Sequence, residues 1–333
     1  MNNYKSEMFK AEIKDYALYI IPQAVLRHIF GSKRPIESVY SSIKSKESGS
    51  VGLFVAAQLG VALFFSMICI IPMAAVVFGR IFVRNKIYIH RVEMSITTYC
   101  TLKCRACSNL MQYYNTPYHI PYEKLIASIE GMLEPIVGLR NLVILGGEPF
   151  LYPELAKLLE YITKQSKIKR IQVLTNGIIR INDEVIKQLR DSRVLVSVSD
   201  YGLHENKIDN TCRILKENGI MYGRTKQKKW FDFGDLSDKG RSNDEIQKQF
   251  ERCEYKCRCI LNGKLYICPR ASHGVDLGSY EDNANVDLIS SADINERKKQ
   301  ILNVYYLKRF IPACKYCDAG TNDCREIECG EQK

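Results

Sequence analysis

Cysteine placement is the feature that most restricts what this chain can fold into. The sequence has 13 cysteines among 333 residues, and eleven of them fall into three groups. Its first residues are polar and charged, with no secretory signal evident, so metal or iron–sulfur ligation is expected rather than disulfides. The groups are Cys100, Cys104 and Cys107; Cys253, Cys257, Cys259 and Cys268; and Cys314, Cys317, Cys324 and Cys329.

Between the start of the regular pattern at residue 87 and residue 222, short apolar runs alternate with helical segments. This alternation is typical of an α/β fold whose parallel sheet is buried on both faces and binds ligands at the carboxyl ends of its strands. The predicted strands are Ile87–Thr98, Leu142–Leu145, Arg170–Leu174, Val194–Val198 and Ile220–Tyr222. The predicted helices are Tyr122–Ile136, Pro153–Gln165, Asp183–Arg190 and Lys207–Asn218.

The first cysteine group follows the first predicted strand directly, with the spacing C-x3-C-x2-C over Cys100, Cys104 and Cys107. Three thiolates on one tight loop can hold three irons of a cubane and leave the fourth iron open to another ligand. Zinc would need a fourth ligand nearby, and none is obvious in the next residues. Spacing alone does not exclude a structural zinc site or a simple electron-transfer cluster.

Polar and glycine residues follow the later strands at the same edge of the predicted sheet. Glycines let the backbone approach a ligand closely, and carbonyls or a carboxylate can accept hydrogen bonds from an ammonium group. Such residues are also ordinary turn formers at strand ends. They are Gly146, Gly147, Glu148 and Pro149 after the second strand, Asn176 after the third, and Ser197 and Ser199, which share one face of the fourth.

The cysteine loop and the Gly146–Pro149 motif, on successive strands, resemble the radical S-adenosylmethionine (SAM) superfamily. The resemblance implies a partial (β/α)6 TIM-like barrel and a SAM-binding 4Fe-4S cluster on Cys100, Cys104 and Cys107. One departure is Ala106, since the residue before the third cysteine is usually aromatic in this family and packs near adenine. The resemblance also implies SAM contacts from Gly146, Gly147, Glu148, Pro149, Asn176, Ser197 and Ser199.

The second and third cysteine groups resemble auxiliary-cluster domains of the SPASM and twitch type. Cys253-x9-Gly263-x4-Cys268 matches the opening of such domains, and Asn262-Gly263 between apolar residues predicts a tight hairpin. The third group differs from the SPASM string by one residue in two gaps. The eight cysteines are candidate ligands of one or two auxiliary 4Fe-4S clusters, with zinc as the alternative, and the spacing leaves their partition open.

A charge-free stretch precedes the regular pattern: residues 48–79 contain no Asp, Glu, Lys, Arg or His. A helix needs about 20 apolar residues to cross a bilayer, so residues 51–79 predict a membrane anchor, with a buried helical hairpin as the alternative. The predicted organisation is therefore an N-terminal region over 1–86 with an apolar helical segment, a radical SAM core over 87–230 and a SPASM-like domain over 231–333.

Charge adds little to these expectations. Lys and Arg exceed Asp and Glu by 11. A solvated basic surface explains this balance, and no nucleic-acid-binding motif accompanies it, so no nucleic-acid partner is expected.

The resemblance implies an enzyme that reductively cleaves SAM to a 5′-deoxyadenosyl radical, which then oxidises or modifies a substrate. The substrate would be a peptide, or a small molecule such as a sugar, and a flavodoxin or ferredoxin would supply electrons. No residue is assigned as a catalytic acid or base. The expected location is the cytoplasmic face of a membrane, or the cytoplasm without an anchor. The alternative function is a membrane-associated, non-catalytic iron–sulfur or zinc protein for electron transfer.

Overall fold

Two compact units, Met1–Ile87 and Tyr88–Lys333, make up the chain. The computed structural model describes residues 74–76, 78–79, 87–281, 283–290, 293–306 and 309–332. The predicted membrane segment, 51–79, lies outside the described residues except at 74–76 and 78–79. Within the described stretches, no helix is both long enough and apolar enough to cross a membrane.

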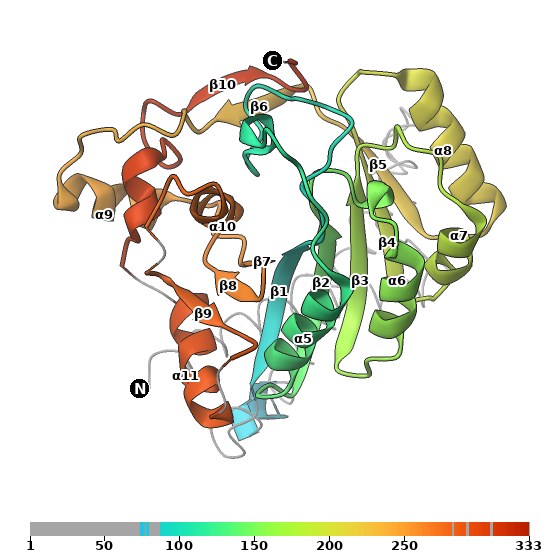
Figure 1. Cartoon of the computed structure of the whole chain (residues 1–333), viewed down its shortest axis with the longest axis horizontal. Coiled ribbons are helices and arrows are strands. Elements are labelled where there is room, and N and C mark those ends of the chain that lie inside the picture. The colour runs from blue at the N-terminus through green and yellow to red at the C-terminus, as the bar shows by residue number, and fades with distance from the viewer. Residues whose placement is uncertain are drawn as a thin grey trace, which may run out of the picture. The chain divides into compact units, whose positions relative to one another are not determined.

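The second unit is organised around a sheet whose first five strands run in chain order (Figure 1). Each of these strands pairs in parallel with the next. The strands are β1 (Tyr88–Ser95), β2 (Gly138–Leu145), β3 (Ile168–Thr175), β4 (Val194–Asp200) and β5 (Tyr222–Lys226). The helices between them are α5 (Tyr122–Leu133), α6 (Leu155–Thr163), α7 (Asp183–Leu189) and α8 (Glu205–Glu217). The predicted alternating α/β fold with a parallel sheet is confirmed.

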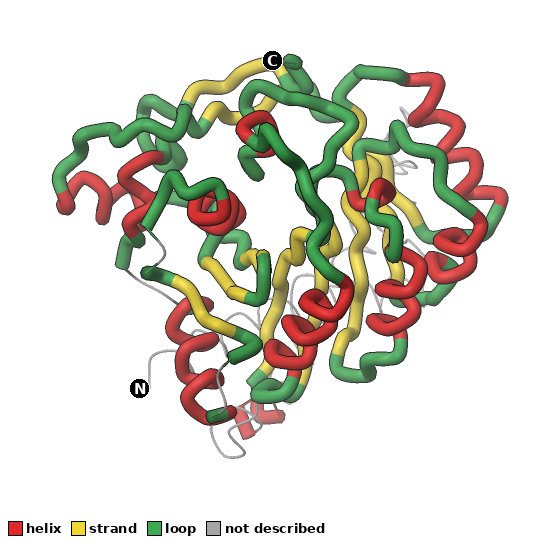
Figure 2. The backbone as a smooth tube through the Cα atoms, in the orientation of Figure 1, coloured by secondary structure: helices red, strands yellow, loops and turns green. Residues whose placement is uncertain are grey.

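The two faces of β1 differ in character because successive side chains point to opposite sides of a strand. Val92 and Met94 are fully buried on one face and continue into Ile96. The helices α5 and α6 lie over one side of the strands in Figure 2, and α5 buries Leu125, Ile129 and Met132. Arg91, Glu93 and Ser95 occupy the other face of β1, so a polar row lies inside the unit.

The Cys-rich part of the chain extends the same sheet. Strand β7 (Cys259–Leu261) pairs in parallel with β1, and β8 (Lys264–Tyr266) and β9 (Asn285–Asp287) follow in antiparallel pairing. The sheet order is β5-β4-β3-β2-β1-β7-β8-β9, which makes it an open sheet ending in β5 and β9. An unpaired β1 edge would expose backbone hydrogen-bonding groups, and β7 satisfies some of them. The sheet therefore continues past residue 230, and the division into a core over 87–230 and a SPASM-like domain over 231–333 stays a prediction.

The predicted hairpin is present between β7 and β8. Asn262 and Gly263 have φ values of 51° and 86°. Positive φ at both central residues is what a two-residue type I′ turn requires, and Asn-Gly tolerates it at little cost. The turn places Cys259 at the start of β7 and Cys268 two residues beyond β8.

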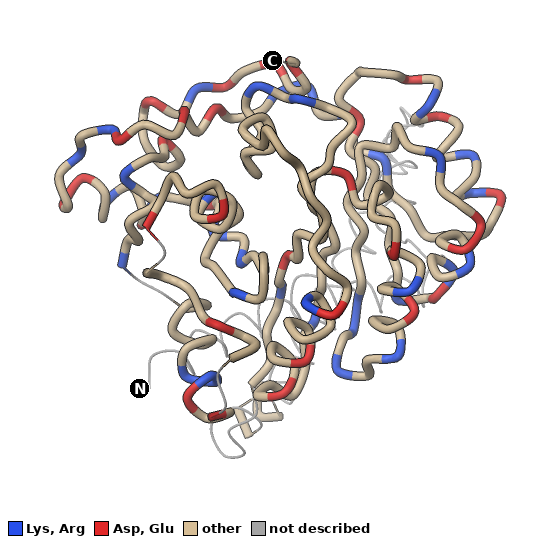
Figure 3. Tube along the Cα trace, viewed as in Figure 1, with Lys and Arg blue, Asp and Glu red and all other residues tan. Residues whose placement is uncertain are grey.

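Of the remaining elements, the ribbon formed by β6 (Lys229–Asp232) and β10 (Arg325–Glu328) lies beyond the carboxyl ends of the parallel strands, whereas α11 (Ile294–Tyr305) lies beside β9 (Figure 1). The two strands of this separate ribbon pair antiparallel. The other helices in this part are α9 (Asn243–Arg252) and α10 (Pro269–Asp276). Basic and acidic residues are interspersed throughout the described part of the chain in Figure 3, as expected for a solvated surface.

Candidate active site

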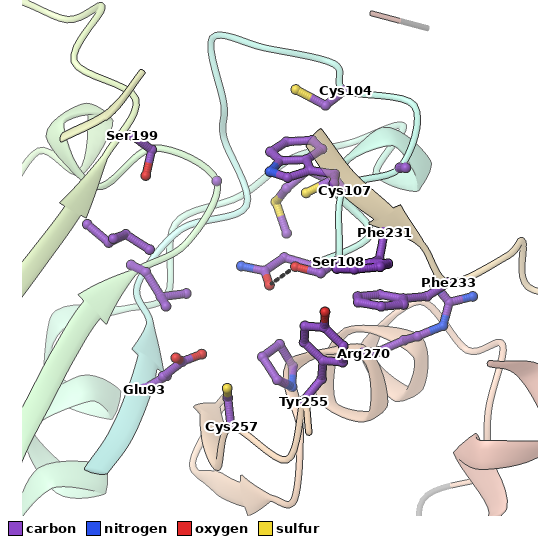
Figure 4. Close-up of a pocket in the computed structure, with 18 of the residues that line it drawn as sticks. Glu93, Cys104, Cys107, Ser108, Ser199, Phe231, Phe233, Tyr255, Cys257 and Arg270 are labelled. Carbon is purple, nitrogen blue, oxygen red and sulfur yellow. Dashed lines mark hydrogen bonds between the residues drawn. The ribbon is translucent and has the colours of Figure 1, made fainter. Parts of the chain in front are cut away.

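A cavity of about 480 Å³ lies where the parallel strands end (Figure 4). Leu145 of β2, Thr175 of β3 and Ser199 of β4 contribute to its wall from the sheet. Its volume falls in the range of roughly 300–1,000 Å³ that is usual for small-molecule sites. The carboxyl edge of a parallel sheet is also where α/β proteins bind ligands, so this cavity is the candidate active site.

The first cysteine group lines one side of the cavity. Cys100, Cys104 and Cys107 all contribute to it from the loop after β1, and Figure 4 shows Cys104 and Cys107 on the same side. Burial raises the pKa of the Cys100 thiol to about 12 and that of Cys104 to about 11. Such thiols are protonated at neutral pH and become thiolates when a metal binds them. The three side chains therefore suit cluster ligation better than nucleophilic catalysis.

The two glycines of the Gly146–Pro149 motif hold the cysteine loop close to the end of β2. A Cβ atom on Gly147 would lie 2.1 Å from the Tyr99 carbonyl oxygen, and one on Gly146 would lie 2.4 Å from the Thr97 carbonyl oxygen. The Gly147 amide instead donates to the Thr97 carbonyl at 2.8 Å. Only residues without a side chain permit this backbone approach. The structure thus gives the glycines a packing role in addition to their place in the cavity wall.

Glu148 is fully buried beneath this motif and does not line the cavity. Its carboxylate accepts hydrogen bonds from Thr175 Oγ1 at 2.7 Å, the Asn176 amide at 2.9 Å and the Phe150 amide at 3.2 Å. The side chain therefore joins the end of β2 to the end of β3. Pro149 likewise lies outside the cavity wall and begins a short 3-10 turn, Pro149–Leu151.

Burial of Glu148 predicts a pH-dependent stability in the iron-free, SAM-free protein. Desolvation raises the pKa of Glu148 from 4.5 to about 7, although hydrogen bonds from Asn176, Thr175 and Phe150 oppose the shift. A raised folded-state pKa means that this stabilisation is complete below pH 4.5 and is lost as the pH rises through 7. The expected loss is about 3 kcal/mol. Urea unfolding at pH 5 and pH 8 measures it.

Glu148→Gln is the control for this prediction, because glutamine does not titrate. The variant loses one acceptor and is expected to be less stable at pH 5. Its stability should nevertheless change less between pH 5 and pH 8 than that of the wild type. Parallel stability profiles for the two proteins would show that Glu148 is not the titrating group.

The predicted polar residues of β3 and β4 divide between the cavity and the sheet. Asn176 lines the cavity, and its Nδ2 donates to Thr101 Oγ1 at 2.9 Å, next to Cys100. Ser199 also lines it. Ser197 lies two residues before Ser199 on β4, farther from the carboxyl end of the strand. There its hydroxyl accepts a hydrogen bond from Gln172 Nε2 at 2.8 Å. Ser197 is therefore part of the polar row inside the sheet rather than of the cavity wall.

Four of the C-terminal cysteines converge on a second, small cavity of about 40 Å³: Cys253, Cys268, Cys314 and Cys317. Burial raises the pKa of each thiol, and negative charge on the neighbouring thiols adds to the shift at Cys268, Cys314 and Cys317. We call these residues the four-thiol group. Three of them, all but Cys314, also line the large cavity, as the first cysteine group does.

The other four C-terminal cysteines lie elsewhere. Cys257 lines the large cavity beside Glu93, as Figure 4 shows, whereas Cys259 is fully buried in β7 with its Sγ 3.9 Å from Ser95 Oγ. Cys324 and Cys329 line neither cavity. Within the described residues, no three His, Cys, Asp or Glu side chains are placed to hold a single metal ion. A cubane has its irons at separate corners, so its ligands need not meet at one point.

The large cavity also has an aromatic wall, whose residues were not predicted from the sequence. The wall consists of Tyr201, Trp230, Phe231, Phe233 and Tyr255. The Tyr201 and Trp230 rings meet edge to face at 4.8 Å, and Phe233 and Tyr255 pack at 4.6 Å. Phe231, Phe233 and Tyr255 lie together on one side in Figure 4. The aromatic residues within Trp230–Phe233, in a segment otherwise rich in charged residues, were the sequence feature that could have indicated this wall.

Glu93 was also missed. It is 6% exposed on the inner face of β1, lines the cavity, and accepts from Arg91 Nη2 at 2.9 Å. Burial raises its pKa, and the Arg91 partner opposes that shift. A charged pair, Arg91 and Glu93, within a strand that is otherwise mostly apolar was the signal in the sequence.

Comparison with known sequences places most of these strands in one family domain. Residues 94–220 match the model of the radical SAM superfamily. GTP 3′,8-cyclase of Aquifex aeolicus (strain VF5) is 25% identical over 229 residues, which cover 66% of this chain and 67% of that protein. Probable GTP 3′,8-cyclase of Methanococcus maripaludis (strain C6) is 33% identical over 113 residues, which cover 33% of this chain and 36% of that protein.

Solved structures give more distant similarities. Native anSMEcpe with bound AdoMet and Cp18Cys peptide is 21% identical with a TM-score of 0.34, covering 41% of this chain and 42% of that one. Streptococcus suis SuiB bound to S-adenosylmethionine is 17% identical with a TM-score of 0.34, covering 52% and 38%. The chain thus spans about two fifths of each of these structures. The domain at residues 94–220, which contains the cysteine loop and the strand ends described above, thus matches the radical SAM superfamily, whose cofactors are a 4Fe-4S cluster and SAM.

Proposed function

We propose that this chain is a radical SAM enzyme that uses the large cavity for both SAM and a second substrate. Cys100, Cys104 and Cys107 would hold the SAM-binding cluster, which when bound supplies the electron for reductive cleavage of SAM. Cleavage yields methionine and a 5′-deoxyadenosyl radical that takes a hydrogen atom from the substrate. Asn176, which contacts the cysteine loop through Thr101, and Ser199 both line the cavity, and they would contact SAM.

The observation that carries this proposal is that one cavity faces two cysteine groups. The three core cysteines line it, and so do Cys253, Cys268 and Cys317 of the four-thiol group. We infer that the four-thiol group holds one auxiliary 4Fe-4S cluster, which four thiolates ligate fully. A substrate between the groups can give a hydrogen atom on one side and an electron on the other, so net oxidation is the supported outcome.

The cavity favours a small molecule over a peptide as the second substrate. Its volume of about 480 Å³ has to accommodate SAM as well. The aromatic wall offers planar faces for stacking. The curated relatives are named GTP 3′,8-cyclases, which makes a nucleotide or nucleotide sugar a reasonable compound to test first. Attachment to the cytoplasmic face of a membrane through 51–79 stays a prediction of the sequence.

Anaerobic iron and sulfide analysis of the full chain, followed by SAM-cleavage assays with dithionite, tests the proposal. We expect iron for two cubanes per chain and formation of 5′-deoxyadenosine. GTP, a nucleotide sugar and a peptide mixture would then be added in separate reactions. The addition that accelerates 5′-deoxyadenosine formation identifies the substrate class. A protein that binds zinc only, or that holds clusters without cleaving SAM, would instead support the non-catalytic alternative.

A further inference from the structure

A segment near the end of the described chain crosses the core cysteine loop. We call this segment, Cys329–Gln332, the strap. The Arg105 amide donates to the Glu331 carbonyl at 2.8 Å, and Cys104 and Gln332 form an isolated antiparallel bridge. At its other end, the Cys329 amide donates to the Lys228 carbonyl at 3.2 Å. The strap therefore connects the β6–β10 ribbon to the loop that carries Cys104.

A glycine allows the strap to turn toward the loop. Gly330 has a φ of 73°, a left-handed conformation that side chains disfavour. A Cβ atom on Gly330 would also lie 2.9 Å from Tyr201 Cβ. Tyr201 belongs to the aromatic wall, so the strap passes close to the cavity as well as to the loop.

The orientation of the Gln332 side-chain amide is fixed by two backbone groups. Its Oε1 lies 2.7 Å from the Lys103 amide nitrogen, which can only donate. Its Nε2 lies next to the Gly330 carbonyl oxygen, which can only accept. Because the amide cannot be flipped without losing both bonds, its NH2 group has to face Cys104 Sγ, at 3.5 Å. The strap thus presents one side-chain N–H donor to a core cysteine sulfur.

We propose that Gln332 is a positioning residue for the SAM-binding cluster: it donates a hydrogen bond to the sulfur of Cys104 and so raises the reduction potential of the cluster. This inference rests on the proposed function, because it requires the cluster at Cys100, Cys104 and Cys107. Hydrogen bonds to cluster sulfurs and exclusion of solvent are two of the properties that set such potentials. A donor stabilises the added negative charge of the reduced cluster, so its removal makes reduction harder. Burial of Cys104 to 5% exposure supports the same role.

The test compares two neighbouring substitutions in the full chain. Gln332→Met keeps the length of the side chain and removes its N–H donor. Glu331→Gln removes the 3.0 Å ion pair with Arg105 but keeps the backbone contacts and Gln332. That ion pair is half exposed, so its loss should matter little for stability. In redox titrations followed by electron paramagnetic resonance, the signal that changes on SAM addition belongs to the core cluster. We expect its midpoint potential to shift to a more negative value in Gln332→Met only.

A second measurement on iron-free protein tests the contact without a cluster. The rate of Cys104 alkylation by iodoacetamide, followed by peptide mass spectrometry, should fall in Gln332→Met, because the reactive thiolate loses the donor that stabilises it. The rate should stay at the wild-type value in Glu331→Gln. An unchanged potential in Gln332→Met, or equal shifts in both variants, overturns the proposal. If the wild type assembles no cluster, the proposed function fails. The alkylation rates still show whether Gln332 donates to Cys104, and equal rates overturn that contact too.

Discussion

A Cys104→Ala variant is expected to lose 5′-deoxyadenosine formation to the level of a protein-free control while retaining its auxiliary iron. The three core thiols are the only cysteine side chains that line their side of the large cavity among the described residues. Two remaining thiolates cannot hold three irons of a cubane. The four-thiol group lies at its own small cavity and does not include Cys104. Iron per chain, acid-labile sulfide and 5′-deoxyadenosine would be measured anaerobically on the same preparation.

Cys212→Ala is the matched control for this experiment. Cys212 lies in α8 and is 9% exposed, so it is a buried cysteine that lines neither cavity. Removal of its sulfur should cost about 1 kcal/mol of stability, as for other small core truncations. Iron content and SAM cleavage should match the wild type. SAM cleavage at the wild-type rate in Cys104→Ala would show that the core cluster is not held by this loop.

A Cys268→Ala variant is expected to lose one cubane of iron and the substrate-dependent reaction, but to keep substrate-free SAM cleavage under dithionite. Cys268 belongs to the four-thiol group and also caps α10, because its Sγ accepts from the Ala271 amide at 3.4 Å. Loss of this cap should cost about 1 kcal/mol. The core loop contains none of these atoms, so its cluster should persist. Iron analysis and spectra recorded with and without SAM distinguish the two clusters.

Cys329→Ala is the comparison for Cys268→Ala. The two cysteines belong to the same C-terminal set by sequence, but Cys329 lies against the Gln227 carbonyl, outside both cavities. Cys329→Ala should therefore retain the iron of both clusters. If Cys329→Ala loses a full cubane and Cys268→Ala does not, the four-thiol partition is wrong.

Local patterns allowed much of the fold and the core of the site to be predicted. The alternation of apolar runs and helices predicted β1 to β5, and the order of cysteine loop and Gly146–Pro149 located the cavity edge. Asn262-Gly263 predicted its hairpin because only a few residue types tolerate two consecutive positive φ values. Strand β2 starts at Gly138, whereas the sequence predicted a start at Leu142. The prediction began late because the first residues of the strand are not a continuous apolar run.

The features that were missed depend on pairing between distant parts of the chain. Period-two alternation put Ser197 and Ser199 on one face of β4. Only Ser199, nearer the carboxyl end of the strand, lines the cavity, and this depends on where the cavity begins along the strand. Cysteine spacing could not show that Cys314 and Cys317 join Cys253 and Cys268. The 3-10 turn at Pro312–Tyr316 brings them together by packing against α9 and α10. Glu148 also satisfies the backbone at the end of β3, a contact that the motif did not reveal. Each of these depends on tertiary contacts.

The pairing of β7 with β1 also has a consequence for biosynthesis. The strands that form the core arise early in translation, whereas β7 is synthesised only after β5, β6 and α9. Until then β1 has a free edge, and contacts between distant segments form late and slowly. A nascent chain stalled before residue 259 would thus carry the core cysteine loop on a sheet that is still open on one side. Ribosome-bound chains of increasing length should become resistant to protease within β1 only once β7 has left the exit tunnel.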